Sequence, residues 1–291
     1  MTDSRNMIDE TIAEIREMQT HSSSVVAVKA TRALSELVER DHATVEEFER
    51  DLERNASALK RANPSHASLF NAMQTVLVNV VDRKDTVSEA KSLLEEVIER
   101  VVEDVQQGKS RAAANAVPTF EDGETVLIHD FSSTVMEAVE EAAAGGTYLT
   151  AYVTEARPRY LGRKTARQLA AFDRVEPHLL VDSAAGSFLE ECDRVVVGMD
   201  CIVGDTLYNR VGTFPIATTA NYLDVPVTVV GSAAKIVDDG FVFENEIRPP
   251  AEVSLEPIED VVIENPAYDA TPVELLDEVI TDNGVKDPEE L

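Results

Sequence analysis

The spacing of apolar residues divides the chain into two parts. From residue 7 to about residue 110, apolar residues recur every three or four positions, as in "MIDETIAEIREM", where Ile8, Ile12, Ile15 and Met18 share one stripe. This spacing puts apolar side chains on one face of a helix and predicts a series of amphipathic helices. The stretch "RANPSHAS" interrupts the series, because Pro64 ends or begins a helix.

After about residue 120 the apolar residues form short runs separated by stretches of helix length. The runs are "TVLIHD", "TYLTAYVTE", "HLLVDSA", "DRVVVGMD", "PVTVVGSA" and, more weakly, "FVFENEI". This alternation predicts an α/β fold whose mostly parallel sheet is doubly wound, with helices on both faces. Near the C-terminus, "NPAYDATPVELLDEVITDNG" predicts a loop and then a helix that starts at Thr-Pro and ends at Asn-Gly. We expect a helical domain over residues 1–115 and an α/β domain over 116–291.

Polar residues follow most of the apolar runs. In a doubly wound sheet the C-terminal ends of the strands share one crevice, so these residues are expected to meet there. Helices begin near these residues, and the free N–H groups at a helix N-terminus favour the binding of an anion such as phosphate. We therefore expect a phosphorylated small molecule as the ligand. The residues are His129, Asp130, Ser132 and Ser133, then Thr154, Glu155 and Arg157, Asp182 and Ser183, Gly198, Asp200 and Asp205, and Ser232 and Lys235.

Structural roles remain open for several of these residues. Ser132 and Ser133 suit the N-cap of the next helix, Asp200 suits a turn, and Lys235 suits an ordinary surface position. The five histidines are scattered without metal-binding spacing, and no phosphate-loop, dinucleotide-binding or nucleophile-elbow motif occurs. The sequence therefore predicts neither a metal nor a cofactor.

The charge balance narrows the choice of partners. There are 55 acidic residues against 26 basic ones, a formal net charge of -29, and no local basic patch stands out. Such a surface repels nucleic acid and anionic membranes, so we expect neither as a direct partner. An acidic shell of this kind is typical of a halophilic protein. Because neither a signal peptide nor an apolar run of membrane-spanning length is present, we expect a cytoplasmic protein.

Three separated motifs resemble those of one protein family. "GMDCIVGDTLYNRVGT" is similar to the signature G-A-D-x-I-x-x-(D/N)-G-x-x-x-N-K-x-G-T of the eukaryotic initiation factor 2B alpha/beta/delta family. "YVTEARPRYLGRKTARQL" resembles the family's Y-V-T-E-(S/T)-R-P-x-x-x-G segment, and "ENPAYDATPVELLDEVITDNG" resembles its ending. The family also includes ribose-1,5-bisphosphate isomerase and methylthioribose-1-phosphate isomerase. The resemblance spans about residues 10 to 285, and the acidic composition favours a haloarchaeal member.

This resemblance implies a helical N-terminal domain on a Rossmann-like C-terminal domain, in a homodimer or larger oligomer. The family's isomerases convert a 1-phosphorylated aldose into a ketose with a Cys and an Asp, whereas its initiation-factor subunits are regulatory. By correspondence, Asp200 is the isomerase Asp, and Asp130 in "IHDFSS" stands where the Cys is expected. Cys192 and Cys201 lie too close to the strand and turn of Asp200 to replace that Cys.

The phosphate-binding positions also differ from those of the isomerases. Their Arg-Gly-Ala near the N-terminus is matched by His21, Ser22 and Ser23, and their second Arg is matched by Asn63. Their Asn-Lys pair becomes Asn209 and Arg210, and Lys235 matches a late Lys. The resemblance thus implies a ligand site made from Ser22, Ser23, Ser24, Ser132, Ser133, Asn209, Arg210 and Lys235.

Three hypotheses follow. The favoured one is a regulatory initiation-factor-like subunit that binds a phosphorylated sugar or nucleotide and has a translation-factor partner. The second is an aldose–ketose isomerase in which Asp130 replaces the Cys as base, against the cost of a second carboxylate beside Asp200. The third is an isomerase for another substrate, in which Ser22, Ser23, Ser24 and Ser132 replace the arginine contacts.

Overall fold

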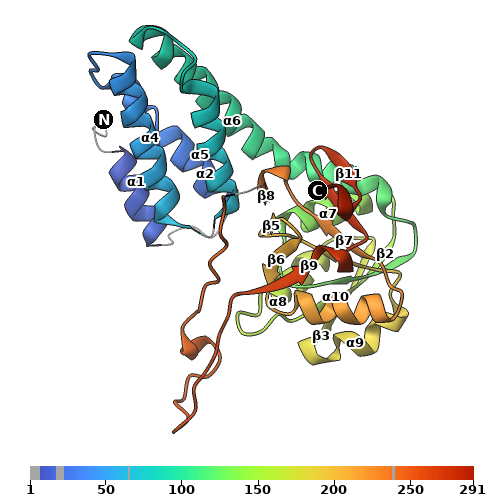
Figure 1. The fold of residues 1–291 in the computed structure, drawn as a ribbon. Coiled ribbons are helices and arrows are strands. Elements are labelled where there is room, and N and C mark those ends of the chain that lie inside the picture. The colour runs from blue at the N-terminus through green and yellow to red at the C-terminus, as the bar shows by residue number, and fades with distance from the viewer. Residues whose placement is uncertain (1–6, 18–22, 65, 238–239) are drawn as a thin grey trace. The chain divides into compact units, whose positions relative to one another are not determined.

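The structure, a computed structural model, describes residues 7–17, 23–64, 66–237 and 240–291 and divides the chain into two compact units. The first unit comprises residues 1–107 with 240–243, and the second comprises 108–239 with 244–291. The first is helical, as predicted. Its helices are α1 (Met7–Arg16), α2 (Ser23–Ala33), α3 (Glu36–Glu39), α4 (Val45–Ala62), α5 (Ala67–Val80) and most of α6 (Val87–Ala116), which continues into the second unit (Figure 1).

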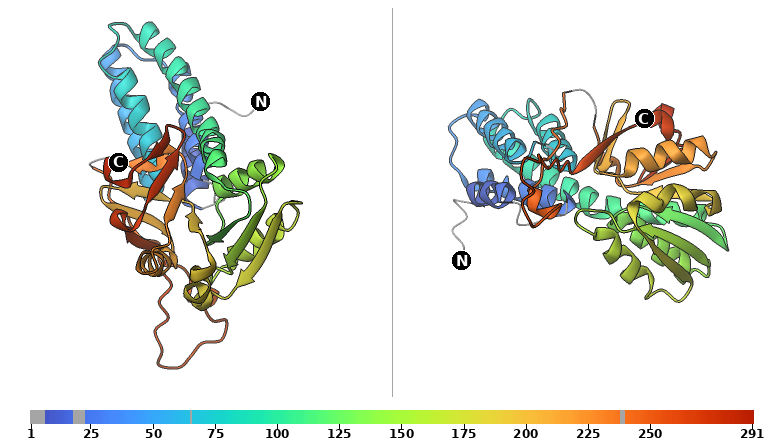
Figure 2. Two further views of the ribbon diagram at one scale, coloured as in Figure 1. Left: turned by 90° about the vertical axis from the view of Figure 1, so that its right-hand side faces the viewer. Right: turned by 90° about the horizontal axis from the view of Figure 1, so that it is seen from below.

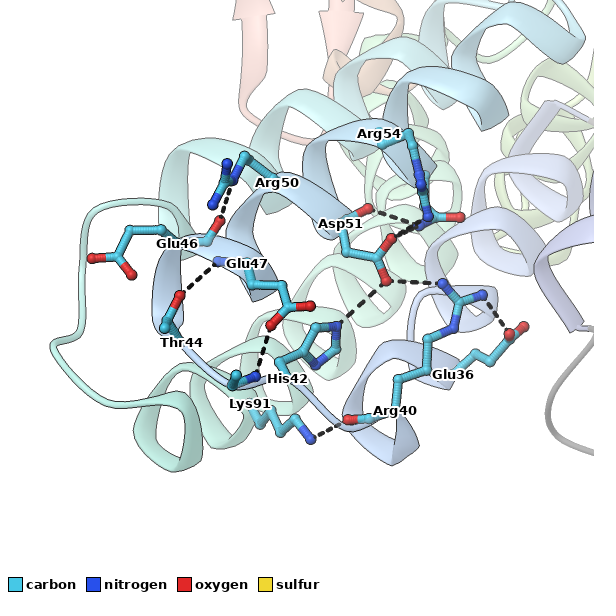
Figure 3. A network of polar contacts seen from close by, with 12 residues as sticks. Glu36, Arg40, His42, Thr44, Glu46, Glu47, Arg50, Asp51, Arg54 and Lys91 are labelled. Carbon is cyan, nitrogen blue, oxygen red and sulfur yellow. Dashed lines mark hydrogen bonds and ion pairs between the residues drawn. The ribbon is translucent and has the colours of Figure 1, made fainter.

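The helical unit has an apolar core and a polar network at one end. Ile8, Phe48 and Leu94 are buried in the core, which follows the stripes read from the sequence. At the end, Asp51 on α4 accepts hydrogen bonds from Arg40 at 2.9 Å and Arg54 at 2.5 Å (Figure 3). These guanidinium groups outweigh the effect of burial and hold the pKa of Asp51 below its usual value. The network fastens the loop after α3 to α4.

The second unit is built on a mostly parallel sheet. Among the described residues, its order is β11-β10-β7-β4-β1-β2-β3, and only the β10–β11 pair is antiparallel. The central strands carry continuous apolar runs because both of their faces are covered. The strands are β1 (Glu124–Ile128), β2 (Leu149–Thr154), β3 (Val175–Leu180), β4 (Arg194–Val197), β7 (Val227–Val230), β10 (Glu278–Thr281) and β11 (Gly284–Lys286).

Helices cover both faces of this sheet, which confirms the doubly wound prediction. Val126 and Ile128 of β1 pack on one face with α7 (Ser133–Ala144) and α8 (Leu161–Leu169). Leu127 packs on the other with α9 (Ala185–Phe188) and α10 (Thr213–Tyr222). This alternation follows from the two-residue period of a strand. Figure 2 shows α7 and α8 in green on one side and α9 and α10 in yellow and orange on the other.

The structure corrects two local predictions and adds a second sheet. No strand forms over residues 241–247, where only Ile247 makes an isolated bridge. The predicted C-terminal helix is wrong, because Val273–Leu275 is a single 3-10 turn and the next residues form β10. In β10, Val279 and Ile280 are fully buried beside β7, and this burial outweighs the helical spacing. The second sheet has the order β8 (Ile236–Val237), β5 (Cys201–Val203), β6 (Thr206–Arg210) and β9 (Tyr268–Pro272).

Candidate functional site

The strand order creates a ligand crevice between β1 and β4. From β1 the chain proceeds to β2 and β3 on one side, whereas from β4 it proceeds to β7 and β10 on the other. At such a switch point the connecting segments diverge and leave a crevice at the C-terminal ends of the two strands. Asp130 comes two residues after β1, and Asp200 comes three residues after β4. The fold therefore brings these two predicted residues to the same edge of the sheet.

Arg210, at the end of β6, lies between the two carboxylates. Its Nε atom is 3.6 Å from Oδ2 of Asp130 and 3.6 Å from Oδ2 of Asp200. At this distance the charges attract, but neither contact is a hydrogen bond, so the facing oxygens keep their bonding capacity. The guanidinium also stacks over the Tyr268 ring at 4.8 Å, which fixes its position. The two carboxylates raise the pKa of Arg210 despite its burial, so it remains a cation.

Asp130 combines burial with an unusual backbone conformation. Its side chain is 7% exposed, and burial raises its pKa above the usual carboxyl value, against the opposing effects of His129 and Arg210. Its φ angle is 60°, in the left-handed region that costs energy for residues other than Gly, although Asn and Asp adopt it more readily than most. Ala156 and Tyr160, on the loop that faces this edge, also have positive φ angles, of 56° and 58°. Such outliers cluster at functional sites.

Three further predicted residues lie at this edge. Ser132 caps α7, since its Oγ accepts a hydrogen bond from the N–H of Val135 at 3.3 Å. The same hydroxyl packs against Gly198, where an added Cβ would lie 2.5 Å from it. Lys235 donates from Nζ to the carbonyl of Met199 at 2.7 Å, next to Asp200, and burial lowers its pKa. Ser132 is therefore the N-cap of α7, as the sequence suggested. Exposed Ser133 is the first residue of the helix, and the positive end of the helix dipole lies at the crevice.

At the same edge, the N-terminus of α10 is already bound by the carboxylate of a side chain. Asp269 accepts hydrogen bonds through Oδ2 from the N–H groups of Gly212 at 2.6 Å and Phe214 at 3.1 Å. Gly212 has a φ of 110°, and an added Cβ would lie 2.7 Å from the ring of His129, so only glycine fits. His129 in turn donates from Nε2 to the carbonyl of Val211 at 2.9 Å. Because Asp269 already neutralises α10, the start of α7 is the better position for a phosphate.

The other predicted ligand residues lie elsewhere. Asn209 is buried and donates to the Thr213 hydroxyl at 3.0 Å, on the opposite face of β6 from Arg210. Ser22 and the side chain of Ser23 are outside the described residues, and Ser24 lies on α2 in the helical unit. Their binding roles therefore stay predictions.

A pocket opens beside Asp130 and holds arginines that the sequence reading did not select. Its empty volume, open solvent at the mouth included, is about 340 Å³. Arg157 was expected at the edge of the sheet, but Arg159 and Arg248 were not, because neither directly follows an apolar run. The residues that line the pocket include Asp130, Arg157, Arg159, Leu161, Arg210, Arg248 and Asn265.

The two cysteines do not supply a reactive thiol. Cys192 and Cys201 are both buried, and burial raises the pKa of each thiol to about 12. A thiol with that pKa stays protonated at neutral pH and is a poor base. Within the described part of the chain, no group of three or more His, Cys, Asp or Glu side chains is placed to hold a metal ion. Among the same residues, no helix is both long and apolar enough to span a membrane.

Comparisons with known proteins agree with the motifs. A family model described as "Initiation factor 2 subunit family" matches residues 19–288. The ribose 1,5-bisphosphate isomerase of Haloterrigena turkmenica is 33% identical, over 96% of this chain and 90% of that protein. The 5-methylthioribose 1-phosphate isomerase of Pyrococcus horikoshii OT3 superimposes with a TM-score of 0.73 at 25% identity, over 97% of this chain and 84% of that one.

A solved initiation-factor complex shares the fold. The tetrameric eIF2B-beta2-delta2 complex of C. thermophilum matches with a TM-score of 0.80 at 19% identity, over 99% of this chain and 92% of that chain. This likeness supports the fold alone. The family model and the haloarchaeal relative each span most of this chain, so the family assignment applies to both units.

Proposed function

Because the chain belongs to the initiation factor 2 subunit family, we propose that it is an aldose–ketose isomerase that acts on a 1-phosphorylated pentose such as ribose 1,5-bisphosphate. The observation that carries the proposal is the pair Asp130 and Asp200, which share Arg210 at the switch point of the sheet. The haloarchaeal relative, an isomerase by name, supports this function over the regulatory role favoured by the sequence alone.

The two carboxyl groups suit the two proton transfers that the reaction needs. The sugar ring opens when its oxygen is protonated and the bond from C1 to that oxygen breaks, and a base must remove the proton on C2. Burial keeps Asp130 protonated to a higher pH than usual, so Asp130 is the proposed acid rather than the base. The more exposed Asp200 is the proposed base.

The same pair completes the reaction. Asp200 returns its proton to C1, and Asp130, which is ionised after the first step, takes the proton of the C2 hydroxyl as that group becomes the ketone. Each carboxyl group then has its starting charge. Arg210 stabilises whichever carboxylate is ionised. Ser132, Ser133 and the start of α7 offer hydroxyl and N–H donors to the phosphate on C1.

An NMR time course of purified protein with ribose 1,5-bisphosphate in molar KCl tests this proposal. The wild-type protein is expected to form the ketose, and Asp130→Asn and Asp200→Asn are each expected to slow turnover at least a hundredfold, because each lacks a proton carrier. Asp205→Asn is the matched control, since Asp205 is exposed in the turn after β5 and should keep full activity. Absence of turnover by the wild-type protein would contradict the proposal.

A second function has one specific observation in its favour. The position of the expected catalytic Cys holds Asp130, and neither buried thiol can replace it. A protein with the scaffold but without the thiol would suit a regulatory subunit that binds a phosphorylated sugar without turnover. In the same NMR experiment, that function predicts broadened ligand signals and no ketose.

A further inference from the structure

Arginines gather at the pocket beside Asp130, although the chain as a whole is strongly acidic. Four arginines line it, namely Arg157, Arg159, Arg210 and Arg248, whereas the whole chain has a net charge of -29. Arg248 is matched by acidic partners, with hydrogen bonds to Glu252 at 2.9 Å and to Glu246 at 2.8 Å. Since Arg248 donates hydrogen bonds to both carboxylates, they compete less for the remaining arginines.

Arg159 has unused hydrogen-bonding capacity in this pocket. Arg157 donates to the carbonyl of Val253 at 2.9 Å and to the hydroxyl of Tyr160, and Arg210 faces its two carboxylates. Within the described part of the chain, Arg159 makes neither a hydrogen bond nor an ion pair. Its charge adds to the hydrogen bond from Arg248 in lowering the pKa of Glu252. Its guanidinium therefore has donors free for an anion.

The loop that carries Arg159 is held from both sides. Asp182 accepts hydrogen bonds from the N–H groups of Ala156 and Arg157, each at 2.7 Å. At its other end, Gly162 lies so close to the backbone that an added Cβ would be 1.8 Å from the carbonyl oxygen of Thr154. These contacts hold the backbone in place without using the Arg159 side chain. A donor presented by a fixed backbone binds with a smaller loss of entropy.

From these observations we infer that Arg159 binds a second phosphate group on the sugar, the one on C5, and so makes the site selective for a pentose bisphosphate. The inference rests on the proposed function for the placement of the reacting end at Asp130 and Asp200. Arg159 occupies a variable position of the R-P-x-x-x-G segment, so this selectivity belongs to the chain's own sequence. A substrate with an uncharged group at C5, such as methylthioribose 1-phosphate, would leave Arg159 without a partner.

Calorimetric titration with ribose 1,5-bisphosphate and ribose 1-phosphate tests the inference, because these ligands differ only in the C5 phosphate. The titrations use the Asp200→Asn variant, so that binding is measured without turnover. This protein is expected to bind the bisphosphate at least tenfold more tightly. Adding Arg159→Gln should reduce that preference to about twofold or less while leaving the affinity for ribose 1-phosphate nearly unchanged, and Arg159→Lys should restore part of it.

Arg167→Gln is the matched control, since Arg167 is exposed on α8 and does not line the pocket. It should leave both affinities unchanged. Three results would overturn the inference. Arg159→Gln could weaken the binding of both ligands equally, it could leave the preference for the bisphosphate unchanged, or neither ligand could bind at all. If the preference depends on Arg159 but the wild-type protein converts neither sugar, the inference stands and only the isomerase proposal fails.

Discussion

Asp130 shows how one residue can be costly for the fold and useful for chemistry. It is buried with a raised pKa, and it has a positive φ angle. Both features oppose folding, because an ionised carboxylate is poorly solvated there and the backbone is strained. A residue kept in that position is expected to trade stability for function.

The variant Asp130→Asn is therefore expected to be inactive but more stable, by about 0.5–2 kcal/mol at pH 7, the usual gain from relieving one unfavourable site. Asn adopts the left-handed conformation as readily as Asp does, and it has no charge to bury. In the wild-type protein the native state holds the Asp130 proton more tightly than the unfolded state does. Stability therefore falls as pH rises from the usual carboxyl pKa, near 4, to the raised native pKa.

Urea unfolding of both proteins at several pH values measures this effect. The advantage of the Asn variant should grow with pH across that window and then level off. Asp130→Ala separates the two causes, because Ala removes the charge but is strained at a positive φ, and it should gain less. An advantage of the Asn variant that is constant with pH would show that ionisation of Asp130 does not cost stability.

Several site residues could be found in the sequence because they directly follow apolar runs or fall in family motifs. Asp130, Asp200, Arg210 and Lys235 are of this kind, and the structure brings them together. Arg248 was missed because it lies in a loop without periodicity. Asp269 was missed because its role at α10 depends on the pairing of β6 with β9, which no local pattern encodes.

At the scale of elements, the loop between β2 and α8 depends on one close contact. Gly162→Ala is expected to destabilise the protein by about 3 kcal/mol or more, because its Cβ would overlap the carbonyl oxygen of Thr154 at 1.8 Å and the backbone would have to move. Gly186→Ala is the matched control, since its Cβ would lie 3.5 Å from Thr219, an ordinary contact.

Thermal unfolding of the two variants measures the difference. Gly186→Ala should be neutral or slightly stabilising, because alanine favours the helical backbone. Gly162→Ala should also weaken binding of ribose 1,5-bisphosphate, because the displaced loop carries Arg159. Equal melting temperatures for the two variants would mean that the loop adapts without cost.

Elements with strong periodicity were predictable, and elements defined by distant pairing were not. The helices of the first unit and strands β1, β2, β4 and β7 follow directly from their apolar patterns. Strands β5 and β6 are short and are stabilised mainly by pairing with each other, β8 and β9. Strand β10 carries a helix-like pattern, but Asp277 accepts a hydrogen bond from Val227 at 2.8 Å and helps to hold it beside β7.

For the whole molecule, the charge distribution has two opposite consequences. The surface has a large acidic excess, so like charges repel one another in the folded state. The pocket instead gathers four arginines, and its ligand is expected to be an anion. Salt screens both the repulsion among the acidic groups and the attraction between the arginines and the anionic ligand. Salt should therefore raise the stability of the fold and weaken ligand binding.

We therefore expect the melting temperature to rise by roughly 10 °C between 0.1 and 2 M KCl. This rise corresponds to a gain of about 3 kcal/mol in the free energy of unfolding. Over the same range, affinity for ribose 1,5-bisphosphate should fall several-fold, and affinity for ribose 1-phosphate should fall less, because it has one phosphate fewer to be screened. Thermal unfolding and calorimetry at matched salt concentrations measure both. A melting temperature independent of salt would contradict the halophilic prediction, and equal losses for the two sugars would exclude the arginines as the source of selectivity.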